Sequence, residues 1–343
     1  MKIGNDNETT NLVDVIAKEY NLKYKNITNY HDNSRSSDDI RIVVILDNTY
    51  VIKLASKSLV SENELLEINN LSKRYEATNI KTPKLLKTNH NKFSYLTNYK
   101  SNPVISYVET YLDFESLESV KSPKIREQIN KQVFEHLGFF TEKFKDKYLS
   151  TRNSMWSIID HAPLDKELTE KEENINDLIN ALNMLKYSDL SEKIKDETTM
   201  LLLKIKKEGK KLPQSMIQGD LNSSNIMIHN NQFEGLIDFN LYGKETNINT
   251  FLNETMYFLT DDDILNLAPK EILNKMVTTQ KKRMDYILKN YQLSKEELNM
   301  IPIYRKLTYL SFYPNVRLFI HYLNIEEYRE RILDFLNTIL NLQ

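Results

Sequence analysis

The sequence has no cysteine among its 343 residues, which excludes a disulfide framework and any metal site built from thiolates. It also lacks an uninterrupted run of about 18 apolar residues, so we expect no conventional transmembrane helix and no membrane partner. The first residues, MKIGNDNETTN, do not form the apolar core of a signal peptide. These absences favour a cytoplasmic, globular protein.

An excess of charge of one sign is also missing. The chain carries 46 basic and 48 acidic residues, for a formal net charge of −2. A field of that size does not recruit nucleic acid or anionic lipid, so we expect neither as a partner. The apolar content of 40% is enough for a sizeable core, and the length favours two lobes. The oligomeric state is left open.

The order of sequence patterns predicts an α+β protein with two lobes. Residues 1–112 read as mostly β with two helices. The second of two β-rich runs contains a turn at Asp47-Asn48, followed by a strand that carries Lys53. Residues 113–343 read as long amphipathic helices, interrupted by strands only at 216–239, where Asn230-Asn231 supplies a turn. We therefore place a first domain at 1–112 and a second, helical domain at 113–343.

Glycine is scarce, and two of the six glycines fall in one short stretch, MIQGDLNSSNIMIHNNQFEGLIDFN, at 216–240. Asp220 and Asn225 are five positions apart, the interval between the Asp and Asn of a kinase catalytic loop. Asp238 follows Asn225 by thirteen positions and ends an apolar strand. Phosphoryl transfer needs a carboxylate to orient the attacking hydroxyl and oxygen ligands for magnesium. A simpler interpretation is a turn in which these side chains cap backbone donors.

This stretch resembles the Brenner-type motif of the aminoglycoside phosphotransferase and choline kinase superfamily, usually His-Gly-Asp, four residues, Asn, then a strand ending Ile-Asp. Here the motif reads Gln218-Gly219-Asp220, Asn225 and Ile237-Asp238. The resemblance implies a protein-kinase-like bilobal fold with ATP or GTP between the lobes. It also implies that Asp220 is the catalytic base and that Asn225 and Asp238 hold Mg²⁺.

The resemblance also implies a strand lysine that holds the α- and β-phosphates and pairs with a helix glutamate. Lys53 stands on the third predicted strand, and the helical pattern at Ser61–Tyr75 follows it. We choose Glu64 as the partner because it shares a face with inward-pointing apolar residues. Glu62 and Glu67 remain alternatives.

The remaining nucleotide contacts are expected at the lobe junction. Strand SYVETYL has the character of a hinge, where backbone groups of about Glu109 to Tyr111 would meet the nucleobase. No glycine-rich phosphate loop is present. Ser36, with Ser34 and Ser37, can present donors to phosphate, or these serines form only a turn.

The acceptor is expected to reach Asp220 from the second lobe. The residues we assign to it are Glu254, Asn240 and Tyr257, and other acidic groups in the region are Glu245 and Asp261 to Asp263. Aromatic residues of this lobe, among them Trp156, Tyr309 and Tyr322, line a substrate pocket or belong to the core. Because several expected acids are amides, the set suits a neutral or singly cationic polyol better than a polycation.

Two departures from the motif bear on activity. Gln218 replaces the usual histidine, and an acid expected some ten residues beyond Asp238 is missing, with Asn247 and Asn249 in that region. A glutamine amide can donate and accept, as the loop requires.

The sequence therefore predicts a magnesium-dependent phosphotransferase that moves the γ-phosphoryl group of ATP or GTP to a hydroxyl of a small polar molecule such as an antibiotic, sugar, amino alcohol or nucleoside. A nucleotide-binding pseudokinase acting as an interaction module and a protein kinase are the alternatives, and the acceptor and the preferred nucleotide are left open.

Overall fold

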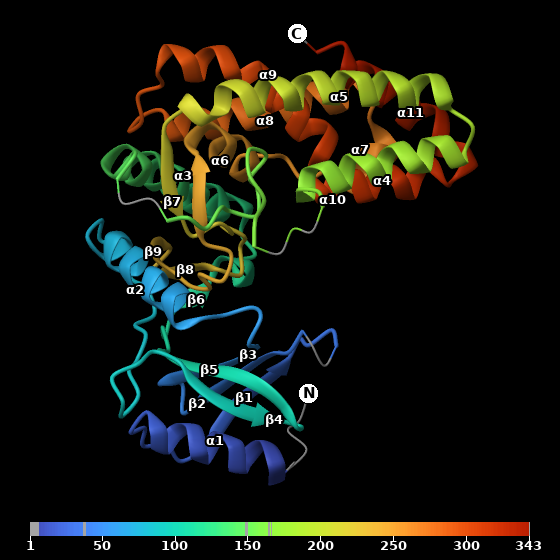
Figure 1. Ribbon diagram of the computed structural model, residues 1–343. Helices are drawn as coiled ribbons and strands as arrows, with labels where there is room; N and C mark the ends of the chain where they lie inside the picture. Colours follow the sequence, from blue (N-terminus) through green and yellow to red (C-terminus); the bar gives the residue numbers. More distant parts are fainter. Residues whose placement is uncertain (1–6, 37–38, 148–149, 164, 166, 343) are drawn as a thin grey trace. The chain divides into compact units, whose positions relative to one another are not determined.

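The computed structural model describes residues 7–36, 39–147, 150–163, 165 and 167–342 (Figure 1). The chain falls into two compact units, one of Met1–Ser122 with Asn222–Ile237 and the other of Pro123–Leu221 with Asp238–Gln343. The first unit thus extends beyond the boundary predicted at 112, and it takes in a hairpin that we had placed in the helical lobe.

Unit 1 is built on a five-stranded antiparallel sheet with the strand order β1-β2-β3-β5-β4. Its elements before the second sheet are α1 (Asn7–Glu19), β1 (Ile27–Asp32), β2 (Arg41–Leu46), β3 (Tyr50–Ser56), α2 (Glu62–Glu76), β4 (Tyr95–Tyr99) and β5 (Asn102–Thr110). The predicted turn between β2 and β3 is confirmed. Asp47 and Asn48 there have φ of 48° and 50°, the left-handed backbone that a two-residue hairpin turn requires.

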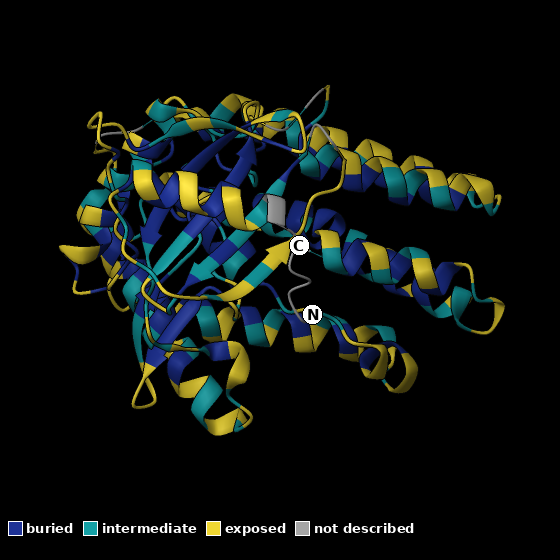
Figure 2. Ribbon diagram, turned by 90° about the horizontal axis from the view of Figure 1, so that it is seen from below, coloured by how far each residue is buried: buried dark blue, intermediate teal, exposed yellow. Residues whose placement is uncertain are grey.

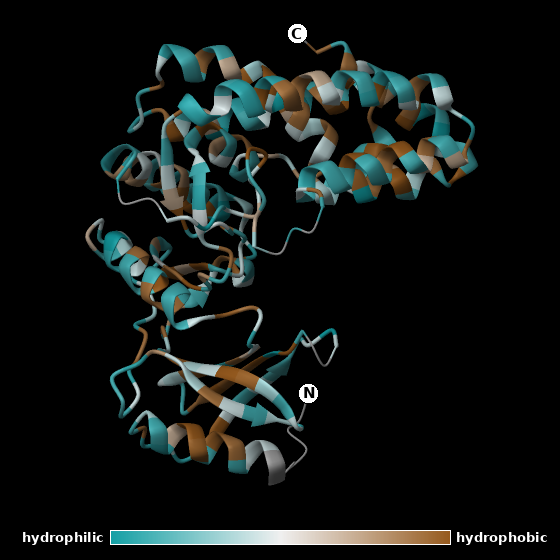
Figure 3. Ribbon diagram, viewed as in Figure 1, coloured by the Kyte–Doolittle hydropathy of each residue, from teal (hydrophilic) through white to brown (hydrophobic). Residues whose placement is uncertain are grey.

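Helix α1 covers one face of this sheet with its apolar stripe, visible as brown segments in Figure 3. Val13 and Ile16 are buried against Ile42 and Val44, which alternate with half-buried residues along β2. This alternation is what a strand with one face in the core produces. The Tyr20 hydroxyl donates to the Phe93 carbonyl at 2.7 Å, so the end of α1 is also fixed by a buried hydrogen bond.

A smaller sheet completes unit 1. It comprises β6 (Glu115–Ser116), β8 (Ile226–His229) and β9 (Gln232–Leu236), in the order β6-β8-β9, and a 3-10 helix follows β6 at Leu117–Ser119. The predicted turn between β8 and β9 is confirmed, since Asn230 and Asn231 have φ of 50° and 58°. The hairpin belongs to unit 1 because β8 pairs with β6 and because Gly235 pairs with Lys81. Such long-range pairings leave no trace in a local sequence pattern.

Unit 2 is mostly helical, with one two-stranded antiparallel sheet. Its helices are α3 (Pro123–Phe144), α4 (Glu170–Met184), α5 (Ser188–Glu208), α6 (Asn247–Glu254), α7 (Asp261–Asn266), α8 (Pro269–Ile287), α9 (Lys295–Ser311), α10 (Tyr313–Leu323) and α11 (Glu326–Leu340), with a 3-10 turn at Gly209–Lys211. The strands β7 (Gln214–Ile217) and β10 (Gly243–Thr246) pair directly with each other. In Figure 2 the helices alternate buried and exposed residues along their length, the amphipathic pattern predicted for this part of the chain.

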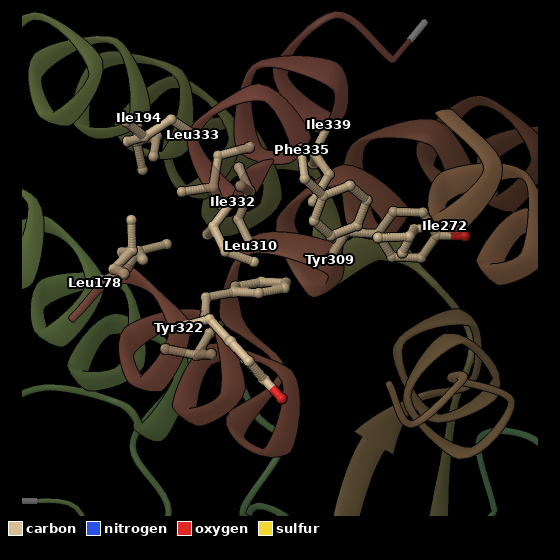
Figure 4. Packing of buried hydrophobic residues seen from close by; sticks show 14 of the residues in the cluster. Leu178, Ile194, Ile272, Tyr309, Leu310, Tyr322, Ile332, Leu333, Phe335 and Ile339 are labelled. Carbon is tan, nitrogen blue, oxygen red and sulfur yellow. The ribbon is translucent and has the colours of Figure 1, made fainter. Parts of the chain in front are cut away.

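The largest core of unit 2 gathers side chains from α4, α5 and α8–α11 (Figure 4). Leu178, Ile194, Ile332 and Phe335 are fully buried in it. Tyr309 and Tyr322 also belong to this cluster. For these two aromatic residues the core interpretation is therefore correct.

Among the described residues, no helix combines the length and the apolar character that crossing a membrane would require.

Candidate active site

Lys53 lies on β3, as predicted, and its ammonium forms a buried ion pair with a carboxylate on the neighbouring strand. The distance from Lys53 Nζ to Glu109 Oε2 is 3.1 Å, and the side chains are only 12% and 7% exposed. In the pairing of β3 with β5, Lys53 lies opposite Tyr107. Glu109 follows Tyr107 by two positions on β5. The strand order creates this pair, because β5 rather than β4 is the neighbour of β3.

Two glutamates of α2 take part in other contacts. Glu64 closes the helix's capping box, accepting from the Ser61 backbone N–H at 2.8 Å and the Ser61 hydroxyl at 2.9 Å. Glu62 accepts hydrogen bonds from the backbone N–H groups of Phe93 and Ser94, both at 2.8 Å. Burial is the largest single influence on the Glu62 carboxyl group and by itself would raise its pKa. The hydrogen bonds together outweigh burial, so the pKa of Glu62 is lowered. The pairing of Glu64 with Lys53 stays a prediction.

The predicted hinge residues, Glu109 to Tyr111, lie at the end of β5. Glu109 pairs with Val51 in the sheet and with Leu85 in an isolated bridge. The backbone N–H of Tyr111 donates to the Thr49 carbonyl at 2.8 Å, so it is already engaged. If Tyr111 meets a nucleobase through its backbone, its carbonyl is the group that can do so.

The predicted phosphate-contacting serines lie in the connection from β1 to β2. The Ser36 carbonyl accepts from the Asp39 N–H at 3.3 Å in a tight bridge. The Ser34 hydroxyl accepts from the Arg41 N–H at 3.0 Å. Ser37 lies outside the described residues. These contacts fit the turn interpretation and leave the phosphate role a prediction.

Asn225 is held at the start of β8 by a side-chain-capped turn. The Asn222 side-chain oxygen accepts from the N–H groups of Ser224 at 2.9 Å and Asn225 at 3.1 Å, a local pattern typical of Asn in turns. The Asn225 carbonyl accepts from the Ile237 N–H at 3.0 Å, and the Asn225 side chain is buried. Asn225 is thus tied to the residue that immediately precedes Asp238.

In unit 2, Gln218 links the loops that carry Asp220 and Asp238. Its side-chain Nε2 donates to the Asp238 carbonyl at 2.6 Å, and its Oε1 accepts from the Asp220 N–H at 2.7 Å. Gln218 is completely buried. The glutamine therefore uses both ends of its amide, one to donate and one to accept. Asp238 itself has a φ of 57°, uncommon for a non-glycine residue and frequent at functional sites.

The two glycines of this stretch are required by close backbone approach. Gly219 has a φ of 87°, and a Cβ there would lie 2.2 Å from the Leu241 carbonyl oxygen. A Cβ on Gly235 would lie 2.7 Å from the Lys81 carbonyl oxygen. Neither position can accept a side chain without displacing backbone. Glycine is therefore used where the Asp220 loop meets the loop after Asp238 and where the hairpin meets residue 81.

Glu254 is the predicted acceptor residue that unit 2 brings to Asp220. It is the last residue of α6 and is half-buried. Burial and the nearby Asp220 carboxylate raise the pKa of Glu254 to about 8, and a hydrogen bond from the Leu221 backbone opposes them. Near neutral pH this carboxyl group is therefore largely protonated in the free protein.

The other acceptor candidates are engaged elsewhere. The Tyr257 hydroxyl donates to Asp263 at 3.0 Å, and Lys275 lies 2.5 Å from the same carboxylate. Asp263 also caps α7 through Thr260, so this acid is engaged by its own helix end and by Lys275 of α8. Asp261 accepts from the Tyr322 hydroxyl at 2.9 Å. The predicted role of Tyr257 in acceptor binding stays a prediction.

The region of the missing acid contains a buried carboxylate and a set of amides. Glu245 is 4% exposed and accepts from the Ser154 hydroxyl at 2.7 Å and the Thr246 N–H at 2.7 Å. Asn249 donates to the Trp156 carbonyl at 2.7 Å, and Asn247 donates to the Tyr291 hydroxyl at 2.9 Å. The backbone here is held by neutral amides and one buried acid, which makes Glu245 a structural group.

Arg152 was not predicted, although it contacts the loop after Asp238. Its guanidinium donates to the Asn240 carbonyl at 2.9 Å and to the Tyr242 carbonyl at 3.0 Å. Asn240, a predicted acceptor residue, is exposed. An arginine 86 positions before Asp238 in the chain carries no sequence signal for this contact, because the contact depends entirely on how the chain folds.

The predicted magnesium ligands are an amide in unit 1, Asn225, and a carboxylate in unit 2, Asp238. Among the described residues, no group of three or more His, Cys, Asp or Glu side chains could hold a metal. Mg²⁺ is typically bound by one or two carboxylates together with substrate phosphates and water. The carboxylate of Asp238 and the amide oxygen of Asn225 are hard oxygen ligands of that kind, and their role in holding Mg²⁺ stays a prediction.

No protein-family model matches this chain, and no curated protein matches it in sequence. Solved structures do match. An amicoumacin kinase in complex with AMP-PNP, Ca²⁺ and Ami is 12% identical over 97% of this chain and 93% of its own, with a TM-score of 0.55. A microcompartment-associated aminopropanol kinase is 11% identical over 95% of each chain, with a TM-score of 0.51. At these identities the likeness establishes the fold, and the predicted α+β, protein-kinase-like bilobal fold is confirmed.

Proposed function

We propose that this protein is a small-molecule kinase, which transfers the γ-phosphoryl group of ATP or GTP to a hydroxyl of a small polar acceptor. The observation that carries the proposal is the Gln218 bridge, which ties the backbones at Asp220 and Asp238 to one buried amide. Both similar structures described above are named as kinases of small molecules.

Each residue has a defined task in this proposal. Asp220 accepts the proton of the acceptor hydroxyl and orients it for attack. Lys53, held by Glu109, contacts the nucleotide phosphates, and a lysine already fixed by a carboxylate loses little side-chain freedom when it binds them. Asn225 and Asp238 would hold Mg²⁺. When bound, the ion would neutralise charge on the phosphate oxygens.

We place the acceptor at Glu254, the proposed substrate group beside Asp220. A carboxyl group that is largely protonated near neutrality can donate a hydrogen bond to a hydroxyl, and it can ionise when an amine approaches. This favours a neutral or singly cationic polyol. For an acceptor that carries an amine, Glu254→Gln should raise the KM, because it removes a charge-assisted hydrogen bond worth roughly 1.5–3 kcal/mol. It should leave the KM for nucleotide unchanged.

The decisive experiment is a nucleotide-consumption screen against hydroxylated metabolites and antibiotics, run with ATP and with GTP in the presence of Mg²⁺. Consumption that depends on one acceptor and disappears in Asp220→Asn supports the proposal. Nucleotide binding without consumption across the panel favours the pseudokinase alternative, for which Gln218 and the amides at Asn247 and Asn249 are the supporting features. Phosphate incorporated into a peptide library would instead favour a protein kinase.

A further inference from the structure

A short segment of unit 2 that the proposed function does not use contacts both loops of the site. Residues 152–154 lie beside β10, where the Lys244 N–H donates to the Arg152 carbonyl at 2.9 Å. The Ser154 N–H donates back to the Lys244 carbonyl at 3.0 Å. The approach is so close that a Cβ on Gly243 would lie 2.4 Å from the Ser154 nitrogen. The segment is therefore fixed to the strand that follows the Asp238 loop.

From this anchored backbone, Arg152 reaches the Asp238 loop. Its Nε and Nη2 donate to the carbonyls of Tyr242 and Asn240, and its guanidinium lies 4.6 Å from the centroid of the Tyr242 ring. Two donors in a rigid fork, together with ring stacking, fix both the position and the direction of the loop backbone. A lysine, which has a single point of charge, cannot reproduce this arrangement.

Trp156 reaches the Asp220 loop from the same segment. Its indole Nε1 donates to the Gly219 carbonyl at 3.0 Å. Gly219 has a left-handed backbone, with a φ of 87°. The indole N–H is a donor only, so its geometry sets where that carbonyl points. The peptide concerned is the one that joins Gly219 to Asp220.

Trp156 is in turn held from behind by a chain of buried amides. Its carbonyl accepts from Asn249 Nδ2 at 2.7 Å, and the Asn249 side-chain oxygen accepts from Asn253 at 2.9 Å. Asn253 accepts from the Lys171 ammonium at 2.7 Å, and Lys171 is 2% exposed. Each of these amides both donates and accepts, so the tryptophan backbone is supported by a chain of satisfied buried polar groups.

We infer that Arg152 and Trp156 are positioning residues, which hold the Asp238 loop and the Asp220 loop in one fixed arrangement through a single backbone segment. The inference rests on the proposed function for its kinetic consequence. Its structural part, the restraint on the two loops, is independent of the acceptor. Supporting groups of this kind typically change activity by roughly 10- to 100-fold when altered.

The test compares Arg152→Lys and Trp156→Phe with the control Arg331→Lys. Arg331 also donates to two backbone carbonyls, those of Ile264 and Leu265, and it lies on α11 away from both loops. Three quantities are measured for each: kcat with the acceptor found in the screen, Kd for Mg²⁺-nucleotide, and peptide-resolved amide hydrogen exchange. The protein's single tryptophan adds a fluorescence signal from the Asp220 loop in the wild type and in Arg152→Lys.

We expect kcat to fall roughly 10- to 100-fold in both site variants while Kd for nucleotide stays within a few-fold. Amide exchange should accelerate at 219–221 in Trp156→Phe and at 239–243 in Arg152→Lys, and in Arg331→Lys only near Ile264. If both loops exchange at the wild-type rate in the two site variants, or if kcat falls no more than in Arg331→Lys, the inference is wrong. If the wild type transfers nothing to any acceptor, the proposed function fails, and the exchange rates alone decide whether the segment holds the loops.

Discussion

The side-chain amide of Gln218 donates to the backbone carbonyl of Asp238 across 2.6 Å, in a position with no solvent exposure. The same amide accepts from Asp220, two positions away in the chain, while Asp238 is 20 positions away. One side chain thus sets the spacing between the backbones of the two acidic residues on which the proposed chemistry depends. Glutamine can form this bridge because its amide both donates and accepts.

Gln218→Leu should therefore damage both folding and activity. It leaves the Asp238 carbonyl and the Asp220 N–H, which are partly buried, without this partner, and this should lower the free energy of unfolding by about 1–3 kcal/mol. Gln218→His, which can donate and accept through its two ring nitrogens, should retain most of the stability and turnover. Denaturant unfolding and kcat, measured on both variants, check this. Equal behaviour of the two variants would show that the bridge is unimportant.

Asp220→Asn should lower turnover by roughly 10²- to 10⁴-fold, because the variant cannot accept the acceptor's proton. Nucleotide binding should stay within a few-fold, since no phosphate contact is assigned to this side chain. Asp196→Asn, on an exposed position of α5, is the matched control. Unchanged turnover in Asp220→Asn would remove Asp220 from the role of base.

Asp238→Asn should weaken Mg²⁺-dependent nucleotide binding and abolish transfer, because one of few charged ligands for the ion is lost. Asparagine is preferred to alanine here since it tolerates the left-handed backbone at this position. Calorimetric titration of nucleotide at several Mg²⁺ concentrations measures the effect. The same magnesium dependence in variant and wild type would contradict the assignment.

Glu254 should make stability depend on pH in a defined window. Its pKa is raised from 4.5 to about 8 in the folded protein, so between these values the folded state binds a proton that the unfolded chain has released. The free energy of unfolding contributed by this group therefore decreases as the pH rises through the window. Glu254→Gln should match the wild type near pH 4 and become more stable than it towards pH 8.

Thermal midpoints of Glu254→Gln and wild type across this range provide the measurement, and Glu192→Gln, at an exposed position, is the control. A constant difference at every pH would show that Glu254 titrates normally. The nucleotide is left out of these samples, because bound phosphate would alter the charge around the carboxyl group.

The sequence by itself determined the features that depend on near neighbours in the chain. The turns at Asp47-Asn48 and Asn230-Asn231 were predictable because Asp and Asn tolerate the left-handed backbone that both turns contain. The strand position of Lys53 and the helix that begins after Ser61 follow from hydrophobic periodicity and capping chemistry. The spacing of Asp220, Asn225 and Asp238 was likewise readable, since it lies within one short stretch.

Only the tertiary structure decided which distant groups meet. Lys53 pairs with Glu109 because β5 is the neighbour of β3 in the sheet. The residue pattern of either strand does not predict this strand order. The β8–β9 hairpin joins unit 1 through pairing with β6 and residue 81, and Arg152 reaches the Asp238 loop from 86 positions away. Local sequence sets backbone preference and the buried face of each element. Contacts between elements depend on how the whole chain packs, and so the supports of the site could be seen only in the folded protein.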